Sequence, residues 1–216
     1  MRYELIVFDW DGTLIDSAGA IVASMQAACR DLGLPEPSRE RASHVIGLGL
    51  RDSLAYVAPD LPESGYARMV ERYRFHFLSR DAGLPLFDGA REMLEELESR
   101  GHVLAIATGK SHAGLQRALE QTGIGRHFAA TRCADRTAPK PAPDMLRELM
   151  DELAGAREST LMVGDTTHDL EMAANAGVSA VAVAYGAHPR EKLRPFAPLA
   201  VVDRPEELRR WLGLNA

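Results

Sequence analysis

The sequence predicts an α/β protein, namely a Rossmann-like core with a parallel β-sheet that is interrupted by an all-helical insertion. The apolar run from Tyr3 to Phe8 is typical of a buried first strand. From residue 88 onward, helical and strand-like patterns alternate, which is typical of a parallel sheet with right-handed crossovers. Residues 15–85 carry only helical patterns. We therefore expect a core domain of residues 1–14 and 86–216, and a helical domain of residues 15–85.

Apolar periodicity and chain-breaking residues predict the individual elements. In the insertion, helical spacing begins after Asp16 or Ser17, which can cap a helix, and stops at Gly33. Prolines and glycines then divide the chain into shorter helices, which end at residue 46 or span residues 50–58 and 63–80. The predicted strands of the core cover residues 102–108, 128–133, 160–163 and 178–184, with a short one at 200–202. The predicted core helices end at Gly101 and Gly177 or span residues 111–123, 143–153 and 205–212.

Composition argues against several classes of protein. Acidic residues outnumber basic ones by 31 to 25, giving a formal net charge of −6, and no basic run marks a surface for nucleic acid or an anionic membrane. Cys29 and Cys133 are too few and too far apart for a disulfide framework or a cysteine zinc site, so we expect buried thiols. No apolar run approaches the ~20 residues of a membrane span. We expect a cytoplasmic monomer or homodimer that binds neither nucleic acid nor membrane.

Reactive side chains follow the predicted strands at their carboxyl ends, where open α/β sheets bind ligands. The first strand ends at Asp9 and Asp11, and Gly12 allows the sharp turn that holds both carboxylates at this edge. Carboxylates packed closely there would raise one another's pKa values unless a cation neutralised them. The candidate ligands are all oxygen atoms, with no cysteine and no pair of histidines among them, which favours a hard metal ion. Because few carboxylates are available, the ion would keep several water ligands, so we predict Mg²⁺. Two further strands end at Thr108-Gly109 and at Asp165, with Asp169 four residues later, and Lys140 lies in the loop beyond a fourth strand.

These residue types predict phosphoryl transfer. A carboxylate beside Mg²⁺ can attack phosphorus, because an aspartyl phosphate divides one difficult displacement into two easier ones. We therefore predict Asp9 as the nucleophile, and Asp11 as the group that protonates the leaving alcohol and then deprotonates the hydrolytic water. Mg²⁺, Lys140, the Thr108 hydroxyl and backbone amides near Gly109 would stabilise charge on the phosphoryl oxygens.

Four motifs occur in order and carry a resemblance to one family. They are Asp9-Trp10-Asp11-Gly12-Thr13-Leu14, Ala107-Thr108-Gly109-Lys110, Lys140-Pro141-Ala142-Pro143-Asp144 and Gly164-Asp165-Thr166-Thr167-His168-Asp169. The chain resembles phosphatases of the haloacid dehalogenase (HAD) superfamily, in the phosphoglycolate phosphatase-like branch. The resemblance implies a Rossmann-like HAD core with a helical C1-type cap inserted after the first strand. It also implies that Mg²⁺ is bound by the Asp9 carboxylate, the Asp11 backbone carbonyl and Asp165, while Asp169 supports the metal or Lys140.

Rival activities of this superfamily can be weighed from the residues. Dehalogenases usually lack the second aspartate, which is present here as Asp11, and phosphonate hydrolases use a cap lysine, whereas residues 15–87 contain no lysine. A phosphosugar mutase of the β-phosphoglucomutase type is the alternative, although such proteins commonly have Val or Ile at the position of Thr13. An inorganic or nucleotide pyrophosphatase also stays open. A catalytically silent sensor of a phosphorylated metabolite would be expected to lose the nucleophile, the second aspartate or the lysine, and all three are present.

Substrate choice is expected to lie in the cap, because the core grips only the phosphate. Within the loop of residues 47–51, the glycines allow close approach, and Arg51 could pair with a substrate carboxylate or a second phosphate. We predict Gly12, Thr108, Gly109, Lys140 and Arg51 as substrate-binding residues. His44, His76, His112 and His188 show no metal-ligand spacing. His168 of the fourth motif could face either the site or solvent, and no role is assigned to any of these histidines.

Overall fold

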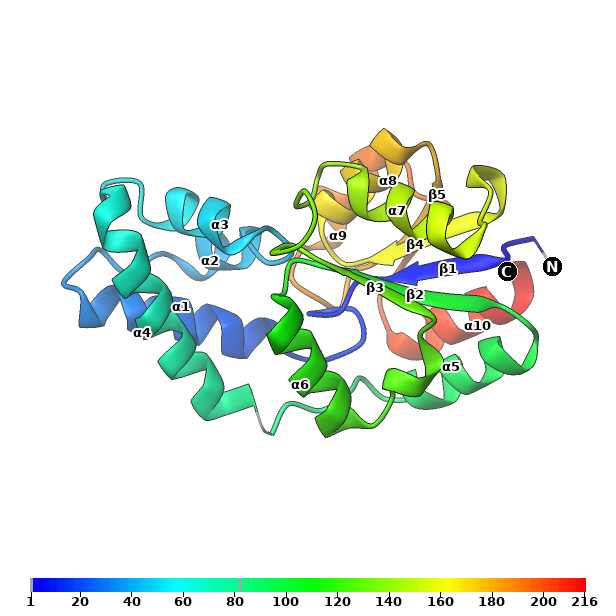
Figure 1. Cartoon of the computed structure of the whole chain (residues 1–216), viewed down its shortest axis with the longest axis horizontal. Helices are drawn as coiled ribbons and strands as arrows, with labels where there is room; N and C mark the ends of the chain where they lie inside the picture. The colour runs from blue at the N-terminus through cyan, green and yellow to red at the C-terminus, as the bar shows by residue number, and fades with distance from the viewer. Residues whose placement is uncertain (1, 82) are drawn as a thin grey trace.

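The computed structural model describes residues 2–81 and 83–216, and a parallel six-stranded sheet forms the centre of its core (Figure 1). The strands are β1 (Leu5–Phe8), β2 (Val103–Thr108), β3 (Ala130–Cys133), β4 (Thr160–Gly164), β5 (Ser179–Val183) and β6 (Val201–Val202). Their order is β3-β2-β1-β4-β5-β6. The first strand therefore lies in the middle of the sheet, paired in parallel with both β2 and β4.

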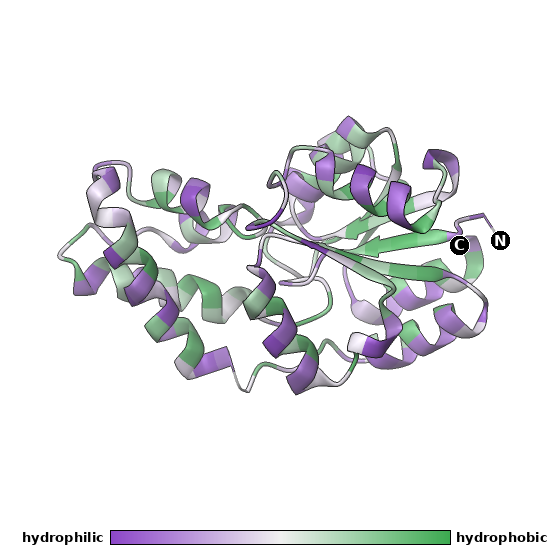
Figure 2. Ribbon diagram, in the orientation of Figure 1, coloured by the Kyte–Doolittle hydropathy of each residue, from purple (hydrophilic) through white to green (hydrophobic). Residues whose placement is uncertain are grey.

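Helices cover both faces of the sheet. They are α5 (Ala90–Ser99), α6 (His112–Thr122), α7 (Asp144–Leu153), α8 (Thr167–Ala176), α9 (Arg190–Leu193) and α10 (Pro205–Asn215). Because strand side chains alternate between faces, Ile6 and Phe8 pack with α5, α6 and α10, whereas Leu5 and Val7 pack with α7 and α8. All four side chains are buried, which explains why the first strand is a continuous apolar run. Figure 2 shows the apolar strands at the centre and hydrophilic residues on the outer sides of the helices.

Four helices between β1 and α5 form a separate bundle beside the sheet, called here the helical insertion (Figure 1). They are α1 (Ala18–Asp31), α2 (Arg39–His44), α3 (Leu50–Val57) and α4 (Glu63–Asp81). The long helices α1 and α4 pack along each other. Met25, Leu54 and Met69 belong to an apolar cluster within this bundle, so the insertion has a hydrophobic core of its own.

The chain leaves the core and returns to it through two neighbouring segments. The N–H of Asp16 donates a hydrogen bond to the Pro85 carbonyl, and the N–H of Phe87 donates one to the Leu14 carbonyl, both at 3.0 Å. Ile15 and Leu86 form an antiparallel bridge between the same segments. The insertion is therefore attached to the core by a paired, two-stranded connection.

The structure confirms the α/β class with its parallel sheet, and the region after β1 is helical as expected. It adds elements that the sequence did not predict, namely α9 and the 3-10 turns Gly125–His127, Arg157–Ser159 and Arg194–Phe196. These segments have at most four residues, which is too short for a periodic pattern to develop. The domain limits at residues 14/15 and 85/86 stay a prediction.

Two further expectations concern the cysteines and the membrane. Cys29 and Cys133 are buried free thiols, as predicted. Among the residues that the structure describes, none of the helices combines the length and the apolar character that a membrane crossing requires.

We expect Ile6→Ala to lower the free energy of unfolding by about 2–5 kcal/mol, because Ile6 is fully buried in the central strand and its truncation leaves a cavity. Leu214→Ala is the control, since Leu214 is 79% exposed and its truncation should change stability by less than about 0.5 kcal/mol. Urea unfolding followed by circular dichroism measures both. Equal losses for the two variants would contradict the placement of β1 at the centre of the core.

Candidate active site

The predicted site residues meet at the carboxyl edge of the sheet, around the end of β1. Asp9 directly follows β1, and its N–H donates a hydrogen bond of 2.9 Å to the Val163 carbonyl of β4. Thr108 is the last residue of β2, and Asp165 directly follows β4. Because β1 pairs with both β2 and β4, these three strand ends are neighbours. The loop between β3 and α7 brings Lys140 to the same edge.

The Lys140 ammonium is buried between two carboxylates. Its Nζ donates to Asp9 Oδ1 at 2.5 Å and to Asp169 Oδ1 at 2.6 Å, and all three side chains are at most 1% exposed. Asp169 Oδ2 accepts the N–H and the hydroxyl of Thr166, at 3.0 and 2.7 Å, as part of the capping box that begins α8. The first turn of α8 therefore holds Asp169, and Asp169 holds Lys140 against Asp9.

Asp165 lies beside this group and is held by backbone and hydroxyl donors. The Thr13 hydroxyl donates to Oδ1 at 3.1 Å, and the Ala187 N–H donates to Oδ2 at 2.6 Å. Gly12 has a φ of +89°, and a Cβ atom there would lie 2.2 Å from Asp165 Oδ2. Glycine is therefore required at this turn for two reasons, the left-handed backbone and the close approach of the carboxylate.

Burial dominates the electrostatics of the cluster. It raises the pKa of the Asp9 carboxyl to about 7, an effect that Lys140 opposes and Asp169 reinforces. Burial, assisted by the neighbouring Asp9 and Asp169, also raises the pKa of Asp165 well above its usual range. Burial alone would lower the pKa of Lys140, but Asp169 and Asp9 outweigh it and raise the pKa above the ordinary value. The ammonium therefore stays charged, while the carboxylates are poised to bind a proton or a cation.

One oxygen of the nucleophile candidate is left without a partner. Asp9 Oδ2 is buried and has no hydrogen-bond partner within residues 2–81 and 83–216. One carboxylate oxygen each from Asp9, Asp165 and Asp169 lies within 4.8 Å of the others. A buried, unpaired carboxylate oxygen is costly, so the arrangement suits a ligand that supplies positive charge or an electrophile.

A cavity of about 540 Å³ opens from Asp9, Asp11 and Thr108 toward the helical insertion. At its floor, the Lys110 Nζ lies 3.2 Å from Asp11 Oδ1. The same ammonium lies 4.5 Å from the centre of the Phe77 ring, which belongs to α4 of the insertion. Lys110 therefore links the second aspartate of the first motif to the wall of the cavity.

The loop of residues 45–49, between α2 and α3, closes over the core. A Cβ atom on Gly109 would lie only 2.5 Å from the Gly47 carbonyl oxygen, so the two backbones touch. Gly47 also lies against the Thr166 side chain, and Gly49 lies against the Pro139 ring. The 45–49 loop therefore rests on three core loops that surround the carboxylate cluster, and its residues form part of the cavity wall.

Comparison with known proteins assigns the family. A family model described as haloacid dehalogenase-like hydrolase matches residues 6–183, which is most of the chain. The chain belongs to this family. Over 211 residues this HAD-like hydrolase is 36% identical to "Probable phosphatase IndB" of Dickeya dadantii (strain 3937), covering 94% of this chain and 91% of that protein.

Two further relatives carry the names of specific phosphatases. The chain is 35% identical over 202 residues to a 5'-nucleotidase of Pseudomonas aeruginosa, covering 92% of this chain and 90% of the relative. It is 31% identical over 188 residues to a phosphoglycolate phosphatase of Agrobacterium fabrum (strain C58), covering 84% and 81%. The chain is therefore an enzyme of this family that is similar to phosphatases over most of its length, and its resemblance to the phosphoglycolate phosphatase-like branch is confirmed.

Among the sequence-predicted residues of the HAD-like hydrolase, Arg51 stands apart from the rest. Its side chain lines the same cavity as Asp9 and Asp11, but it is 73% exposed and forms an ion pair with Glu63. A role for Arg51 in substrate binding stays a prediction. Asp9, Asp11, Thr108 and Lys140 are brought together as expected.

Lys110 and Thr13 lie inside the motifs of the sequence but are not among its predicted site residues. Lys110 directly follows Thr108-Gly109, and that position next to a strand end is a signal for a site residue. Thr13 was used only to weigh the mutase alternative, whereas its hydroxyl in fact binds Asp165.

We expect Lys140→Met to lower the free energy of unfolding by about 3–5 kcal/mol at pH 7.5 without divalent metal, because it leaves two buried carboxylates unpaired. The pKa of Asp9 in the folded state is already above its unfolded value and rises further without the ammonium. The folded variant then binds the extra proton, so its stability should fall as the pH rises from 5 to 7.5.

The control is Lys192→Met, which removes an exposed ion pair with Glu40 and should cost less than about 1 kcal/mol. Urea unfolding at both pH values, in EDTA, measures the two variants. A Lys140→Met protein as stable as Lys192→Met at pH 7.5 would show that the buried ammonium does not hold the cluster together.

Proposed function

We propose that this HAD-like hydrolase is a Mg²⁺-dependent phosphatase that hydrolyses a small phosphorylated metabolite, a phosphoglycolate-like phosphomonoester, through an aspartyl-phosphate intermediate. One observation carries the proposal. Lys140 binds Oδ1 of Asp9, while the buried Oδ2 has no hydrogen-bond partner in the described part of the chain. The ammonium fixes the orientation of the carboxylate and leaves its second oxygen available to attack phosphorus.

The residues present fit a divalent cation. When the carboxylates of Asp9, Asp165 and Asp169 are all ionised, their three negative charges face the single positive charge of Lys140, so two (three minus one) are left unbalanced in a buried site. Asp169 contacts the Lys140 ammonium directly, whereas Asp165 does not, and we assign Asp169 to the support of Lys140. Asp9, Asp165 and the Asp11 backbone carbonyl would then hold Mg²⁺. When bound, Mg²⁺ would neutralise this charge and the negative charge of the phosphoryl oxygens.

The reaction then follows from the positions of two aspartates. Asp9 Oδ2 forms a bond to phosphorus as the bond from phosphorus to the ester oxygen breaks, and Asp11 gives its proton to the departing alkoxide. Asp11 next takes a proton from a water molecule that attacks the same phosphorus. The bond from phosphorus to Asp9 breaks, and inorganic phosphate leaves. Lys140 and the Thr108 hydroxyl would contact the phosphoryl oxygens during both steps.

The cavity supports a leaving group of moderate size. Its volume of about 540 Å³ lies in the range of ordinary small-molecule sites, and it is lined by apolar side chains such as Met25, Tyr73 and Phe77. Lys110 and Arg117 also line this cavity, where they pair with the carboxylates of Asp11 and Asp81. One relative is named a 5'-nucleotidase and another a phosphoglycolate phosphatase, so a substrate screen should include nucleotides and phosphoglycolate.

A screen of phosphomonoesters with purified protein and Mg²⁺ tests the function. The release of inorganic phosphate is measured, and the substrates are ranked by kcat/KM. We expect EDTA to abolish release and Asp9→Asn to reduce kcat by at least about 1,000-fold, because the amide cannot form the acyl phosphate. Asp52→Asn, which changes an exposed carboxylate on α3, should keep normal activity. Tight metabolite binding without phosphate release would favour a sensor, and isomerised sugar phosphate without release would favour a mutase.

Metal affinity should depend on pH. Since burial raises the pKa of Asp9 to about 7 and also raises that of Asp165, protons compete with Mg²⁺ for these carboxylates in acid. We expect the apparent Mg²⁺ affinity to be at least about tenfold weaker at pH 5.5 than at pH 7.5. Isothermal titration calorimetry at the two pH values measures it, and equal affinities would contradict the proposed ligands.

A further inference from the structure

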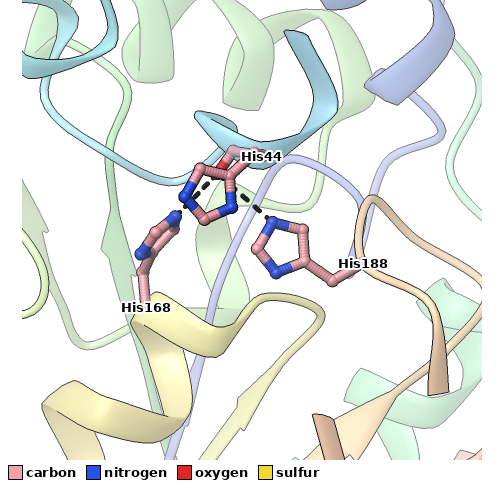
Figure 3. Close-up of side chains that lie close together, drawn as sticks. All are labelled: His44, His168 and His188. Carbon is pink, nitrogen blue, oxygen red and sulfur yellow. Dashed lines mark hydrogen bonds between the residues drawn. The ribbon is translucent and has the colours of Figure 1, made fainter. Parts of the chain in front are cut away.

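Three histidines from distant parts of the chain meet where the helical insertion contacts the core (Figure 3). His44 ends α2, His168 lies in the first turn of α8, and His188 follows β5. Their ring centres lie 5.2–5.4 Å apart, and the rings of His44 and His188 are stacked nearly parallel. His168 and His188 are buried, whereas His44 is half-buried. The proposed reaction uses none of them.

The hydrogen bonds of this cluster converge on one backbone carbonyl. Nε2 of His168 lies 2.7 Å from the His44 carbonyl oxygen, and Nε2 of His188 lies 3.2 Å from the same atom. The Thr167 N–H donates to Nδ1 of His188 at 3.0 Å. A neutral imidazole that accepts at one nitrogen carries its proton on the other, so Nε2 of His188 must be a donor. The carbonyl of the insertion is therefore held by two ring N–H groups of the core.

A transition-metal site is the other interpretation of three clustered histidines, since one ring nitrogen of each lies within 4.8 Å of the others. Both nitrogens of His188 are already engaged, however. A metal on either nitrogen would leave the Thr167 N–H or the His44 carbonyl without this partner. The hydrogen-bonded arrangement therefore explains the cluster better than a metal does.

The carbonyl held in this way belongs to the residue that precedes the 45–49 loop. That loop touches the core at Gly109, Thr166 and Pro139 and lines the cavity beside Asp9. The two donors sit on the segments that hold the acidic residues. His168 precedes Asp169, and the residue before His188 donates its N–H to Asp165. One cluster therefore joins the carboxylate site to the wall of the cavity.

We propose that His168 and His188 are positioning residues, which clamp the His44 carbonyl and so hold the 45–49 loop where it contacts the leaving group of the substrate. The ring of His44 stacks on the ring of His188, but both hydrogen bonds of the clamp end at the His44 backbone oxygen. The kinetic part of this proposal rests on the proposed phosphatase function. The structural part, which is the position of the loop in the free protein, does not.

His168→Leu removes the donor and keeps a buried side chain of similar size, and His168→Gln replaces Nε2 by an amide nitrogen that can still donate. His44→Ala is the matched control, because it removes the ring and keeps the carbonyl. We expect His168→Leu to raise KM for the best metabolite of the screen about tenfold, the effect of losing a buried hydrogen bond, with kcat nearly unchanged. Hydrolysis of p-nitrophenyl phosphate should change little. His168→Gln and His44→Ala should resemble the unmodified protein.

Hydrogen exchange of the metabolite-free protein gives a readout that does not depend on activity. In the 45–49 loop, the amides of Ile46 and Leu48 donate to Ser43 and Val45. We expect His168→Leu to speed their exchange about tenfold while α5 and α10 are unaffected, and His168→Gln to restore it. If His168→Leu does not fold, His168→Asn serves instead, since its shorter amide cannot reach the carbonyl.

Unchanged exchange in the loop would overturn the clamp, whatever substrate the protein hydrolyses. An effect of His44→Ala as large as that of His168→Leu would also overturn it, because a metal or the ring stacking would then hold the cluster. If no phosphomonoester is hydrolysed, the proposed function fails, and the exchange measurements still decide the structural part.

Discussion

The contact between the buried Lys140 ammonium and the carboxylates of Asp9 and Asp169 is the constraint on which this structure depends. An ammonium removed from water is tolerated only when opposite charges surround it at hydrogen-bond distance. Those charges come from the end of β1 and from the first turn of α8. The pairing therefore fixes how the loop after β3, the central strand and α8 meet. The same contact orients one oxygen of Asp9 and leaves the other without a partner.

The core and the helical insertion contribute different parts of the site. The core positions charged groups through short backbone and capping hydrogen bonds, as the donors to Asp165 and Asp169 show. The helical insertion contributes most of the apolar wall of the cavity, from α1, α4 and the 45–49 loop. Lys110 connects the two, since it contacts both Asp11 and the Phe77 ring. A change in the insertion can therefore reach the reacting groups without altering the strands.

The sequence predicts the core and the carboxylate cluster well because their positions follow from topology. Once β1 is a buried parallel strand, Asp9 must lie at its carboxyl edge, and the same holds for Thr108 and Asp165. The histidine cluster could not be predicted in this way. Its members come from three separate segments, and His44 joins the two core histidines only when the insertion docks on the core.

Arg51 and Lys110 also have contacts that could not be predicted from the sequence. Arg51 forms an exposed ion pair with Glu63, and a weak surface contact of this kind leaves no pattern in the sequence. Lys110 lies where a motif places it, but its partners include Phe77 of a different part of the fold. Short elements such as α9 were missed because four residues define no period.

The paired connection between core and insertion has a consequence for how such a protein can diversify. The segments that leave and re-enter the core are hydrogen-bonded to each other at Asp16 with Pro85 and at Leu14 with Phe87. The two attachment points are therefore adjacent in space, and a bundle of different length could be grafted between them without moving the sheet. A chimaera built at these two points would keep the sheet and the carboxylate cluster of one parent while taking its helical bundle from the other.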